Sequence, residues 1–317
     1  MSETPPILWE PPDALVQRAR LTEFMGWLRD ERGIDHDDYQ ALWQWSVDDL
    51  DGFWRAIWDF FGVRSPDAPS ATLGERSMPG TEWFPGTRLN YAEHLFRDKP
   101  DDRVAILHAS ERRELAEMTW GELRDMTARI RAGLVRAGVE RGDRVAAYLP
   151  NIPETIAALL ATASLGAIWS SAAPEFGAKS VVDRFAQIEP KVLLTVDGYR
   201  YNGRDHDRTE VVAQLEREIP SLERVFTLGY IDPEADAGNW DELVGEPGEL
   251  AFEPVPFDHP LWVLYSSGTT GLPKAIVQGQ GGILLEHLKK LNLHTDLHEG
   301  DRLFWFTTTG WMMWNFL

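Results

Sequence analysis

The spacing of apolar residues predicts that the first hundred positions are largely helical. In segment 21–28 the apolar residues recur at i, i+3, i+4 and i+7, the period of one helix face: Leu21, Phe24, Met25 and Leu28. A longer run with helical spacing follows: Leu50, Phe53, Trp54, Ile57, Trp58 and Phe61. Ser46, with Asp49 three residues later, resembles a capping box that starts this second helix, and Gly62 predicts its end. Tryptophans at this period are more often core than ligand platforms, so we interpret them as core or inter-domain contacts.

From about residue 102 the pattern changes to alternating strands and helices. The predicted strands cover 104–108, 144–149, 167–171, 192–196, 224–228 and 261–265. The predicted helices cover 119–138, 153–165, 179–188 and 209–219, and the first opens on a capping box of Thr119 and Glu122. Repeated alternation of this kind predicts an α/β fold with a mostly parallel sheet and helices on both faces.

The segments around the last of these strands carry turn-forming residues. Residues 231–260 are rich in Asp, Glu, Gly and Pro and predict a surface excursion. Residues 279–282 predict a turn, and the leucines that follow predict a helix ending near His294. Residues 303–307 predict a strand, which continues as a loop over 308–315.

A loop of small residues separates two apolar strands in the stretch 261–277, LWVLYSSGTTGLPKAIV. Each loop residue offers a backbone N–H and several offer a hydroxyl, so the loop can fold closely around an anion: Ser266, Ser267, Gly268, Thr269, Thr270 and Gly271. Lys274 can place a positive charge on the same anion. The spacing is not that of a Walker A motif, which needs GxxxxGK[ST] and a helix directly after the loop. A surface turn with an unrelated lysine is the alternative.

The net charge of −20, from 51 acidic and 31 basic residues, argues against nucleic acid as a partner. The negative electrostatic field of the whole protein opposes anion binding at the loop, unless Mg²⁺ accompanies a bound nucleotide. Adaptation to a cytoplasm with a high salt concentration is an alternative explanation for the excess of acidic residues. The lack of cysteine excludes disulfides, thiolate metal sites and a cysteine nucleophile, and we predict no metal-ligating residues.

The termini and the apolar stretches carry no targeting or membrane signal. The segment MSETPPILWEPPD has neither a basic n-region nor an apolar core, so it is not predicted to be a signal peptide. The alanine-rich stretch Thr155–Ser171 is too short and too mildly apolar to span a bilayer. We expect a cytoplasmic protein without a membrane partner.

Two segments resemble a known family. Residues 266–274, SSGTTGLPK, resemble the phosphate-binding signature of AMP-forming acyl-CoA synthetases. Residues 82–96 are similar to the entry segment of acetyl-CoA-synthetase-like members, which carry a helical N-terminal extension. The resemblance implies such an extension over residues 1–100 and an AMP-binding (adenylation) domain over 101–317, incomplete at its C-terminus. Within the family, Ala275 and the segment 307–315, TTTGWMMWN, resemble the acetoacetyl-CoA synthetase subgroup.

The resemblance implies an acid–thiol ligase that uses ATP, CoA and Mg²⁺. Acetoacetate and ATP form acetoacetyl-adenylate and pyrophosphate, and CoA then displaces AMP. In this interpretation the loop 266–271 holds the β- and γ-phosphates, and Lys274 is the catalytic cation that offsets their charge. The alternative for Lys274 is an exposed lysine that ends a turn.

The same resemblance assigns two further groups of residues. Trp311, Met312 and Met313 form the acyl pocket, since bulky side chains close a site for a short β-keto acid; plain core is the alternative for the methionines. Arg200 and Arg204 match the arginines that hold the CoA nucleotide, with one residue more between them than in the family pattern. Solvated arginines are the alternative.

Several parts of the family's machinery are not found in residues 1–317. These are the aromatic–Gly–x–Thr–Glu motif for adenine and Mg²⁺, the ribose-binding Asp, and the C-terminal domain with the adenylation lysine. We therefore expect the N-terminal part of a longer protein. Another short-chain or propionyl-type acyl-CoA synthetase, or a non-catalytic nucleotide-binding half-protein, remains open. A substrate panel separates the first from an acetoacetate enzyme, and ATP-induced thermal stabilisation together with the reading frame tests the second.

We predict that the polypeptide 1–317 alone does not catalyse acetoacetate-dependent exchange between ATP and pyrophosphate, because the adenylation lysine is missing. Isotope exchange with the purified polypeptide measures this. A rate above that of a sample without acetoacetate contradicts the prediction.

Overall fold

A computed structural model describes residues 7–233, 239–266 and 271–317. The chain forms two compact units, each discontinuous in sequence. Unit 1 comprises Met1–Val63, Pro69–Pro85 and Ile283–Phe304, and unit 2 comprises Arg64–Ala68, Gly86–Gly282 and Trp305–Leu317. The division into 1–100 and 101–317 rests on family resemblance rather than on compactness, and it stays a prediction.

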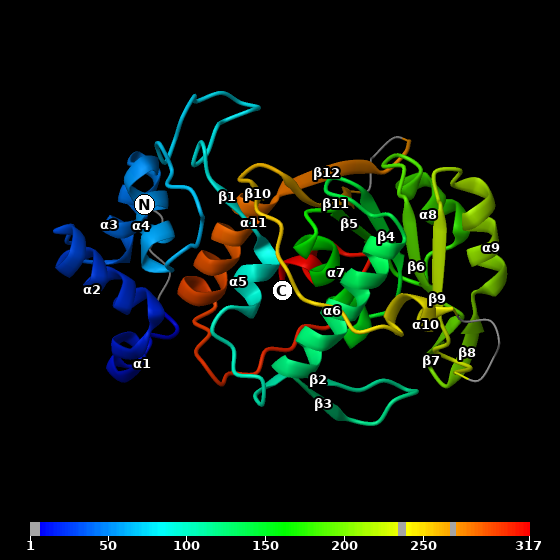
Figure 1. The fold of residues 1–317 in the computed structure, drawn as a ribbon. Coiled ribbons are helices and arrows are strands. Elements are labelled where there is room, and N and C mark those ends of the chain that lie inside the picture. The colour runs from blue at the N-terminus through cyan, green and yellow to red at the C-terminus, as the bar shows by residue number, and fades with distance from the viewer. Residues whose placement is uncertain (1–6, 234–238, 267–270) are drawn as a thin grey trace. The chain divides into compact units, whose positions relative to one another are not determined.

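Unit 1 is helical, as the apolar period predicted (Figure 1). Its elements are α1 (Asp13–Arg18), α2 (Arg20–Arg32), α3 (Tyr39–Asp48), α4 (Leu50–Phe60) and the π-helix η1 (Leu288–His294). Aromatic side chains fill its interior: Trp58 is buried and stacks on Phe84 with 4.5 Å between ring centroids, and Phe24 meets Phe60 edge-on at 5.1 Å. The interpretation of the aromatic stripe as core is therefore confirmed for Trp58.

The boundary between α3 and α4 differs from the prediction. Ser46 lies inside α3, where its hydroxyl donates to the Trp43 carbonyl at 2.7 Å. Asp49 is itself the N-cap of α4, and its carboxylate accepts from the Gly52 N–H at 2.9 Å. The capping box at Ser46 is wrong, because Asp caps a helix as well as Ser does and stands closer to the apolar run. The predicted end is confirmed, since Gly62 takes the left-handed conformation at φ 56°.

Unit 2 is built on a six-stranded sheet with the strand order β12-β11-β5-β4-β6-β9. The strands are β4 (Arg144–Tyr148), β5 (Ile168–Ala172), β6 (Val192–Val196), β9 (Arg224–Leu228), β11 (Pro260–Ser266) and β12 (Lys274–Gly279). All neighbours are parallel except β12, which pairs with β11 in antiparallel register. The predicted α/β fold with a mostly parallel sheet is confirmed.

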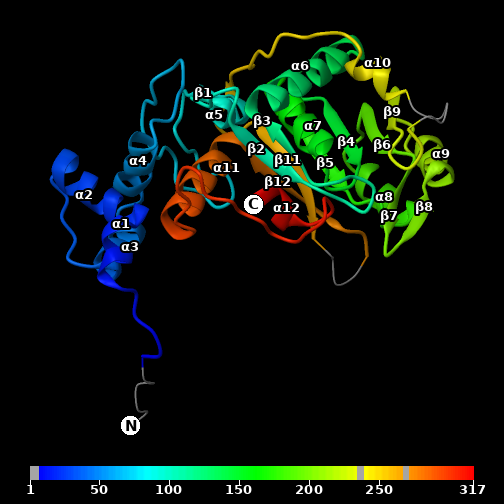
Figure 2. The same cartoon turned by 90° about the horizontal axis from the view of Figure 1, so that it is seen from below.

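Helices cover both faces of this sheet (Figure 2). They are α6 (Trp120–Arg136), α7 (Pro153–Ser164), α8 (Ala178–Phe185) and α9 (Thr209–Glu218), and α6 opens on the predicted capping box of Thr119 and Glu122. Side chains of α8 and α9 pack on β4, β5 and β6 in one buried cluster: Ala146, Tyr148, Ala172, Val181, Phe185, Leu193, Val212, Leu215 and Ile219. Helices α6 and α7 lie on the opposite face. The crossovers from β4 to β5 and from β5 to β6 therefore use opposite faces, which makes the carboxyl end of β4 a topological switch point.

Three antiparallel strand pairs and four short helices complete the described elements. The pair β1 (Arg88–Leu89) and β10 (Val255–Pro256) joins distant parts of the chain, and two hairpins are formed by β2 (Val104–His108) with β3 (Ala116–Thr119) and by β7 (Gly198–Tyr201) with β8 (Arg204–Asp207). The helices are α5 (Tyr91–Phe96), α10 (Trp240–Val244), α11 (Gln280–His287) and α12 (Met312–Phe316).

Some predictions after residue 230 are wrong. Segment 231–260 is more than an excursion, because α10 buries Leu243 and packs against α6. Helix α11 starts at Gln280, inside the predicted turn, where Gly281 allows close approach to the Phe257 ring. Residues 303–307 form no strand, since no described segment pairs with them. Helix α12 begins within the predicted loop 308–315, whereas the helix end predicted near His294 is confirmed.

In the ranges that the structure describes, no helix is both long and apolar enough to cross a membrane.

Asn90 ties α5 to two other segments of unit 2. Its side chain is fully buried, and its Oδ1 accepts from the Ala92 N–H at 3.0 Å as the cap of α5. Its Nδ2 donates to the carbonyl oxygens of Ala163 and Glu253, both at 2.9 Å.

We predict that Asn90→Ala lowers the free energy of unfolding by about 2–4 kcal/mol, because it removes a helix cap and the further hydrogen bonds of a fully buried amide. Urea denaturation followed by circular dichroism measures the change. The control is Asp125→Ala, which removes an exposed pair with Arg129 and should cost less than about 0.5 kcal/mol. Equal effects of the two substitutions contradict the prediction.

Candidate functional site

The hairpin of β11 and β12 carries the candidate phosphate loop. Residues Leu261–Leu264 are buried, and Ser266 pairs with Lys274 across the base of the loop. Ser267, Gly268, Thr269 and Thr270 lie outside the described residues. Because β11 runs parallel to β5, its carboxyl end lies at the same edge of the sheet as the switch point at β4. The predicted placement of the loop after a strand's carboxyl end is confirmed.

Two hydrogen bonds attach the hairpin to α8 and the turn after it. The Tyr265 hydroxyl donates to the Arg184 carbonyl at 2.8 Å, and Gln187 Nε2 donates to the Pro273 carbonyl at 2.9 Å. Burial raises the pKa of Tyr265 to about 12, so its hydroxyl stays protonated as a donor. One contact lies on each side of the loop, which fixes where the loop leaves and re-enters the sheet.

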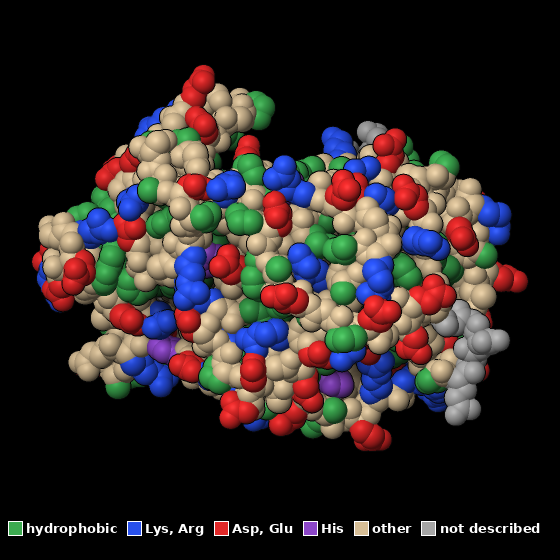
Figure 3. Space-filling view, viewed as in Figure 1, with side chains coloured by type: hydrophobic (Ala, Val, Ile, Leu, Met, Phe, Trp, Pro, Cys, Tyr) green, Lys and Arg blue, Asp and Glu red, His purple; other side chains and the backbone are tan. Residues whose placement is uncertain are grey.

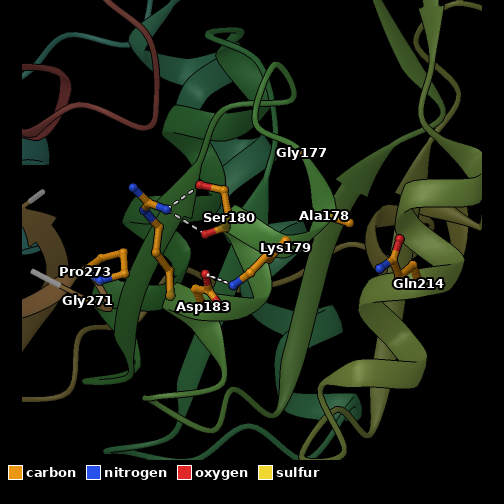
Figure 4. A pocket seen from close by; sticks show the side chains of 9 residues that line it. Gly177, Ala178, Lys179, Ser180, Asp183, Gln214, Gly271 and Pro273 are labelled. Carbon is orange, nitrogen blue, oxygen red and sulfur yellow. Dashed lines mark hydrogen bonds and ion pairs between the residues drawn. The ribbon is translucent and has the colours of Figure 1, made fainter.

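A hollow of about 780 Å³ adjoins the second limb of the loop (Figure 4). Its lining comes from the start of α8, from α9 and from the loop: Gly177, Ala178, Lys179, Ser180, Asp183, Arg184, Gln214, Gly271 and Pro273. Its two cations are already paired, since Lys179 bridges Asp183 at 2.6 Å and Arg184 donates to the Ser180 carbonyl and hydroxyl at 2.6 and 2.5 Å. Lys274, by contrast, is exposed at the base of the loop.

A second loop reaches the same edge of the sheet from residues 308–311. The Thr309 side chain is buried and donates to the Leu149 carbonyl at 2.6 Å, just beyond β4. The Ser171 hydroxyl of β5 donates to the Thr309 carbonyl at 2.7 Å. Gly310 lies against the Phe176 ring, where a Cβ would come within 2.8 Å of the ring. This close approach explains a glycine at that position.

The three predicted acyl-pocket residues follow this loop and lie on the surface of unit 2. The exposed fractions are 63% for Trp311, 43% for Met312 and 37% for Met313. The plain-core alternative therefore fits none of them. They stand one after another beside the switch point.

Arg200 and Arg204 lie on the hairpin of β7 and β8. Its turn is Asn202-Gly203, with φ of 51° and 74°, the positive values of a two-residue type I′ turn. Arg200 pairs with Asp205, and Tyr201 pairs with Arg204. Neighbouring residues of a strand point to opposite faces, so the hairpin places the two arginines on opposite sides of the ribbon.

The Asn-Gly pair between alternating side chains is a strong hairpin signal that the sequence analysis did not use. The contacts around this hairpin also involve Glu111 and Arg112, which no motif in the sequence indicated.

The described residues fit a nucleotide phosphate chain better than they fit a bound Mg²⁺ ion. The exposed Lys274 suits a nucleotide phosphate chain, because it can bring a positive charge to the phosphates. For Mg²⁺, no cluster of three His, Cys, Asp or Glu occurs in the described ranges, so no residue is assigned to it. His287 is a buried helix residue, and burial lowers its pKa to about 4.

Comparison with known proteins places this chain in a family. The family described as "AMP-binding enzyme" matches residues 93–315, and the one described as "Acetyl-coenzyme A synthetase N-terminus" matches residues 39–95. The chain is 42% identical to acetoacetyl-coenzyme A synthetase of Rhizobium meliloti, over 98% of this chain and 49% of the relative. It is 39% identical to acetoacetyl-CoA synthetase of Danio rerio, over 98% of this chain and 48% of the relative.

A solved structure shows the same fold. Acetoacetyl-CoA synthetase from Streptomyces lividans aligns with a TM-score of 0.94 and 54% identity, over 99% of this chain and 49% of that chain. The chain thus spans about half the length of the relatives that it matches. Because the AMP-binding family covers most of the sequence, including the β11–β12 hairpin and the Thr309 loop, the chain belongs to the AMP-binding enzyme family.

Proposed function

We propose that this chain supplies the phosphate- and acid-binding part of an enzyme that joins acetoacetate to CoA. A carboxylate oxygen of acetoacetate attacks the α-phosphorus of ATP, and the bond to pyrophosphate breaks. The CoA thiol then loses its proton and attacks the carbonyl carbon of acetoacetyl-adenylate, and AMP leaves. The observation that carries this proposal is the similarity to the Streptomyces lividans acetoacetyl-CoA synthetase along nearly the whole chain.

The loop 266–271 and Lys274 are assigned to the ATP phosphates. Attack on the α-phosphorus brings a carboxylate to a polyanion, so the protein must neutralise charge and hold both reactants in line. Lys274 stands at the base of the loop opposite Ser266, where its exposed side chain is free to turn toward the phosphates. Mg²⁺ supplies further charge neutralisation when it is bound with ATP.

Trp311, Met312 and Met313 are assigned to the acid. The Thr309 hydrogen bonds hold their loop at the carboxyl end of β4, beside the switch point where α/β sheets bind ligands. Their exposed apolar surface suits the short carbon chain of the acid. Arg200 is assigned to the CoA nucleotide, and Arg204 keeps that role as a prediction from the sequence.

Another short-chain acyl-CoA synthetase is the alternative. Malonamoyl-CoA synthetase of Penicillium aethiopicum is 34% identical over 98% of this chain, which favours this alternative over an unrelated reaction.

We predict acetoacetate-dependent ATP–pyrophosphate exchange in a chimera. In this chimera, residues 1–317 are followed by the part of the Streptomyces lividans enzyme that lies beyond the aligned region. Exchange should be at least about tenfold faster with acetoacetate than with acetate, propionate or butyrate, the range expected when a site recognises one polar group. Faster exchange with one of the other acids contradicts the proposed substrate, and no exchange with any acid contradicts the proposed reaction.

In the same chimera we predict that Lys274→Ala slows exchange by about 10²-fold, because one preorganised charge at the phosphates is lost. Lys99→Ala is the matched control, since Lys99 is exposed and its ammonium group lies 5.6 Å from the centroid of the Trp120 ring. An unchanged rate in Lys274→Ala shows that this lysine is a surface residue.

A further inference from the structure

Helix α12 carries a buried amide that makes no hydrogen bond to the described part of the chain. Asn315 is only 7% exposed, and neither its Nδ2 nor its Oδ1 has a hydrogen-bond partner among the described residues. The other members of the helix are methionines and aromatic residues: Met312, Met313, Trp314 and Phe316. Burial of an unpaired amide costs free energy, so native proteins rarely keep one without a role for it.

A second buried polar atom of the same segment also lacks a partner. The Oγ1 atom of Thr308, in the turn before α12, is buried and makes no hydrogen bond within the described ranges. The turn itself is ordered, since the Trp311 N–H donates to the Thr308 carbonyl at 3.1 Å. Thr309, by contrast, uses both its hydroxyl and its carbonyl group in hydrogen bonds. A polar ligand bound at this edge of the sheet accounts for both unpaired side chains.

Two contacts with the chain after β4 hold α12 in place. The Thr309 hydroxyl donates to the Leu149 carbonyl at 2.6 Å, and the Trp314 indole N–H donates to Asn151 Oδ1 at 2.9 Å. Leu149 and Asn151 follow the carboxyl end of β4, which is the topological switch point. The helix is thus attached on both sides of its first turn. Asn315, directly after Trp314, is positioned by the same contacts.

Asn315 shares a helix face with two of the residues that are assigned to the acid. Residues three and four positions apart lie on one face of a helix. Asn315 follows Met312 by three positions and Trp311, the N-cap residue, by four. Trp311 and Met312 are exposed, whereas Asn315 is buried. The amide is therefore the deeper member of this face, and the two apolar side chains are its outer members.

The chemistry of acetoacetate matches such a face. Its C3 carbonyl oxygen, a hydrogen-bond acceptor, distinguishes acetoacetate from butyrate. A methionine side chain has no donor for this oxygen, and water competes for the indole N–H of the exposed Trp311. Asn315 Nδ2 is a buried donor. An acid that leaves such a donor unpaired is rejected more strongly than apolar contacts alone can achieve.

The amide is neutral, although charged residues make up 26% of this chain. On the face viewed in Figure 3, acidic and basic side chains are interspersed over the surface. A buried cation in place of Asn315 would attract the substrate carboxylate and hold the acid in the reverse orientation, and a buried carboxylate would repel it. An amide donates to the neutral carbonyl oxygen without competing for the anionic end of the acid.

We propose that Asn315 Nδ2 donates a hydrogen bond to the C3 carbonyl oxygen of acetoacetate and thereby selects β-oxo acids over saturated acids of the same length. This inference rests on the proposed function, which supplies the acid. Trp311 and Met312 contact the carbon chain, and Asn315 binds the carbonyl group. The ligand class is a short carboxylic acid with a carbonyl group at C3. It includes malonamate, in which an amino group replaces the terminal methyl group.

ATP–pyrophosphate exchange in the chimera, with acetoacetate and butyrate as paired substrates, tests the proposal. Asn315→Leu removes the donor and keeps a side chain of similar size. It should lower kcat/KM for acetoacetate by about 10- to 100-fold, mainly through KM, and leave kcat/KM for butyrate unchanged or higher. Asn315→Asp keeps the shape but has no N–H donor, so it should lower kcat/KM for acetoacetate at least as much. Malonamate should be a substrate of the unsubstituted chimera and respond to Asn315→Leu as acetoacetate does.

Asn239→Ala is the matched control, because both amide groups of Asn239 are paired. Its Oδ1 accepts from the Thr227 N–H at 2.8 Å, and its Nδ2 donates to the Val225 carbonyl at 2.9 Å. This substitution should lower the melting temperature without changing the ratio of the rates with the two acids. Equal losses with acetoacetate and butyrate in Asn315→Leu overturn the proposal and show that Asn315 is a structural residue. An unchanged rate with acetoacetate overturns it as well.

The outcome can be separated from the proposed function. Absence of exchange with every acid in the unsubstituted chimera contradicts the reaction, whereas a loss of the preference for acetoacetate only in Asn315→Leu supports both proposals. Binding of acetoacetate and butyrate to the purified chain, measured by saturation-transfer NMR, tests Asn315 without turnover. Equal binding of the two acids by the unsubstituted chain, or a preference that survives in Asn315→Leu, overturns the role of Asn315.

Discussion

Three hydroxyl groups at one edge of the sheet hold the candidate site together. At β5, Ser170 donates to the Val263 carbonyl of β11 at 2.9 Å, and Ser171 donates to the Thr309 carbonyl. Thr309 then donates to the carbonyl of Leu149 after β4. These side chains are buried, where an unpaired carbonyl group costs about 1–3 kcal/mol. The phosphate loop and the Trp311 loop are thus fixed to a common support, although some forty residues separate them in the sequence.

The common support of the two loops also explains why this edge of the sheet suits the proposed activation of a carboxylic acid. Parallel strands direct their carboxyl ends to one edge, and the crossovers change from one face of the sheet to the other at β4. A reaction between two anions needs both to be held at fixed distance, which rigid strand ends provide better than a free surface loop does. The shared anchoring residues on β5 therefore connect the architecture to the proposed chemistry.

The sequence predicted the features that depend on the local spacing of apolar residues and on helix-capping residues. Apolar spacing identified the alternating strands and helices of unit 2, and the capping box at Thr119 marked the start of α6 correctly. The sequence-based prediction failed where tertiary contacts decide the structure. Leu243 makes α10 part of the core, and residues 303–307 have the composition of a strand but no partner strand in the described structure. Among the site residues, the loop and Lys274 were visible as a motif. The anchoring role of Thr309 was not visible, because its acceptor lies 160 positions away.

The position of Arg204 shows how one additional residue changes the face of a hairpin on which a side chain lies. Across a two-residue turn, the residues next to the turn are direct cross-strand partners, and each step outward alternates the face. With one residue fewer between them, as in the family pattern, the two arginines would be such partners and would share a face. The additional residue moves Arg204 to the other side of the ribbon from Arg200. On the Arg200 face, the neighbouring guanidinium group is that of Arg112 from the β2–β3 connection, and both lie within 4 Å of the Asp205 carboxylate.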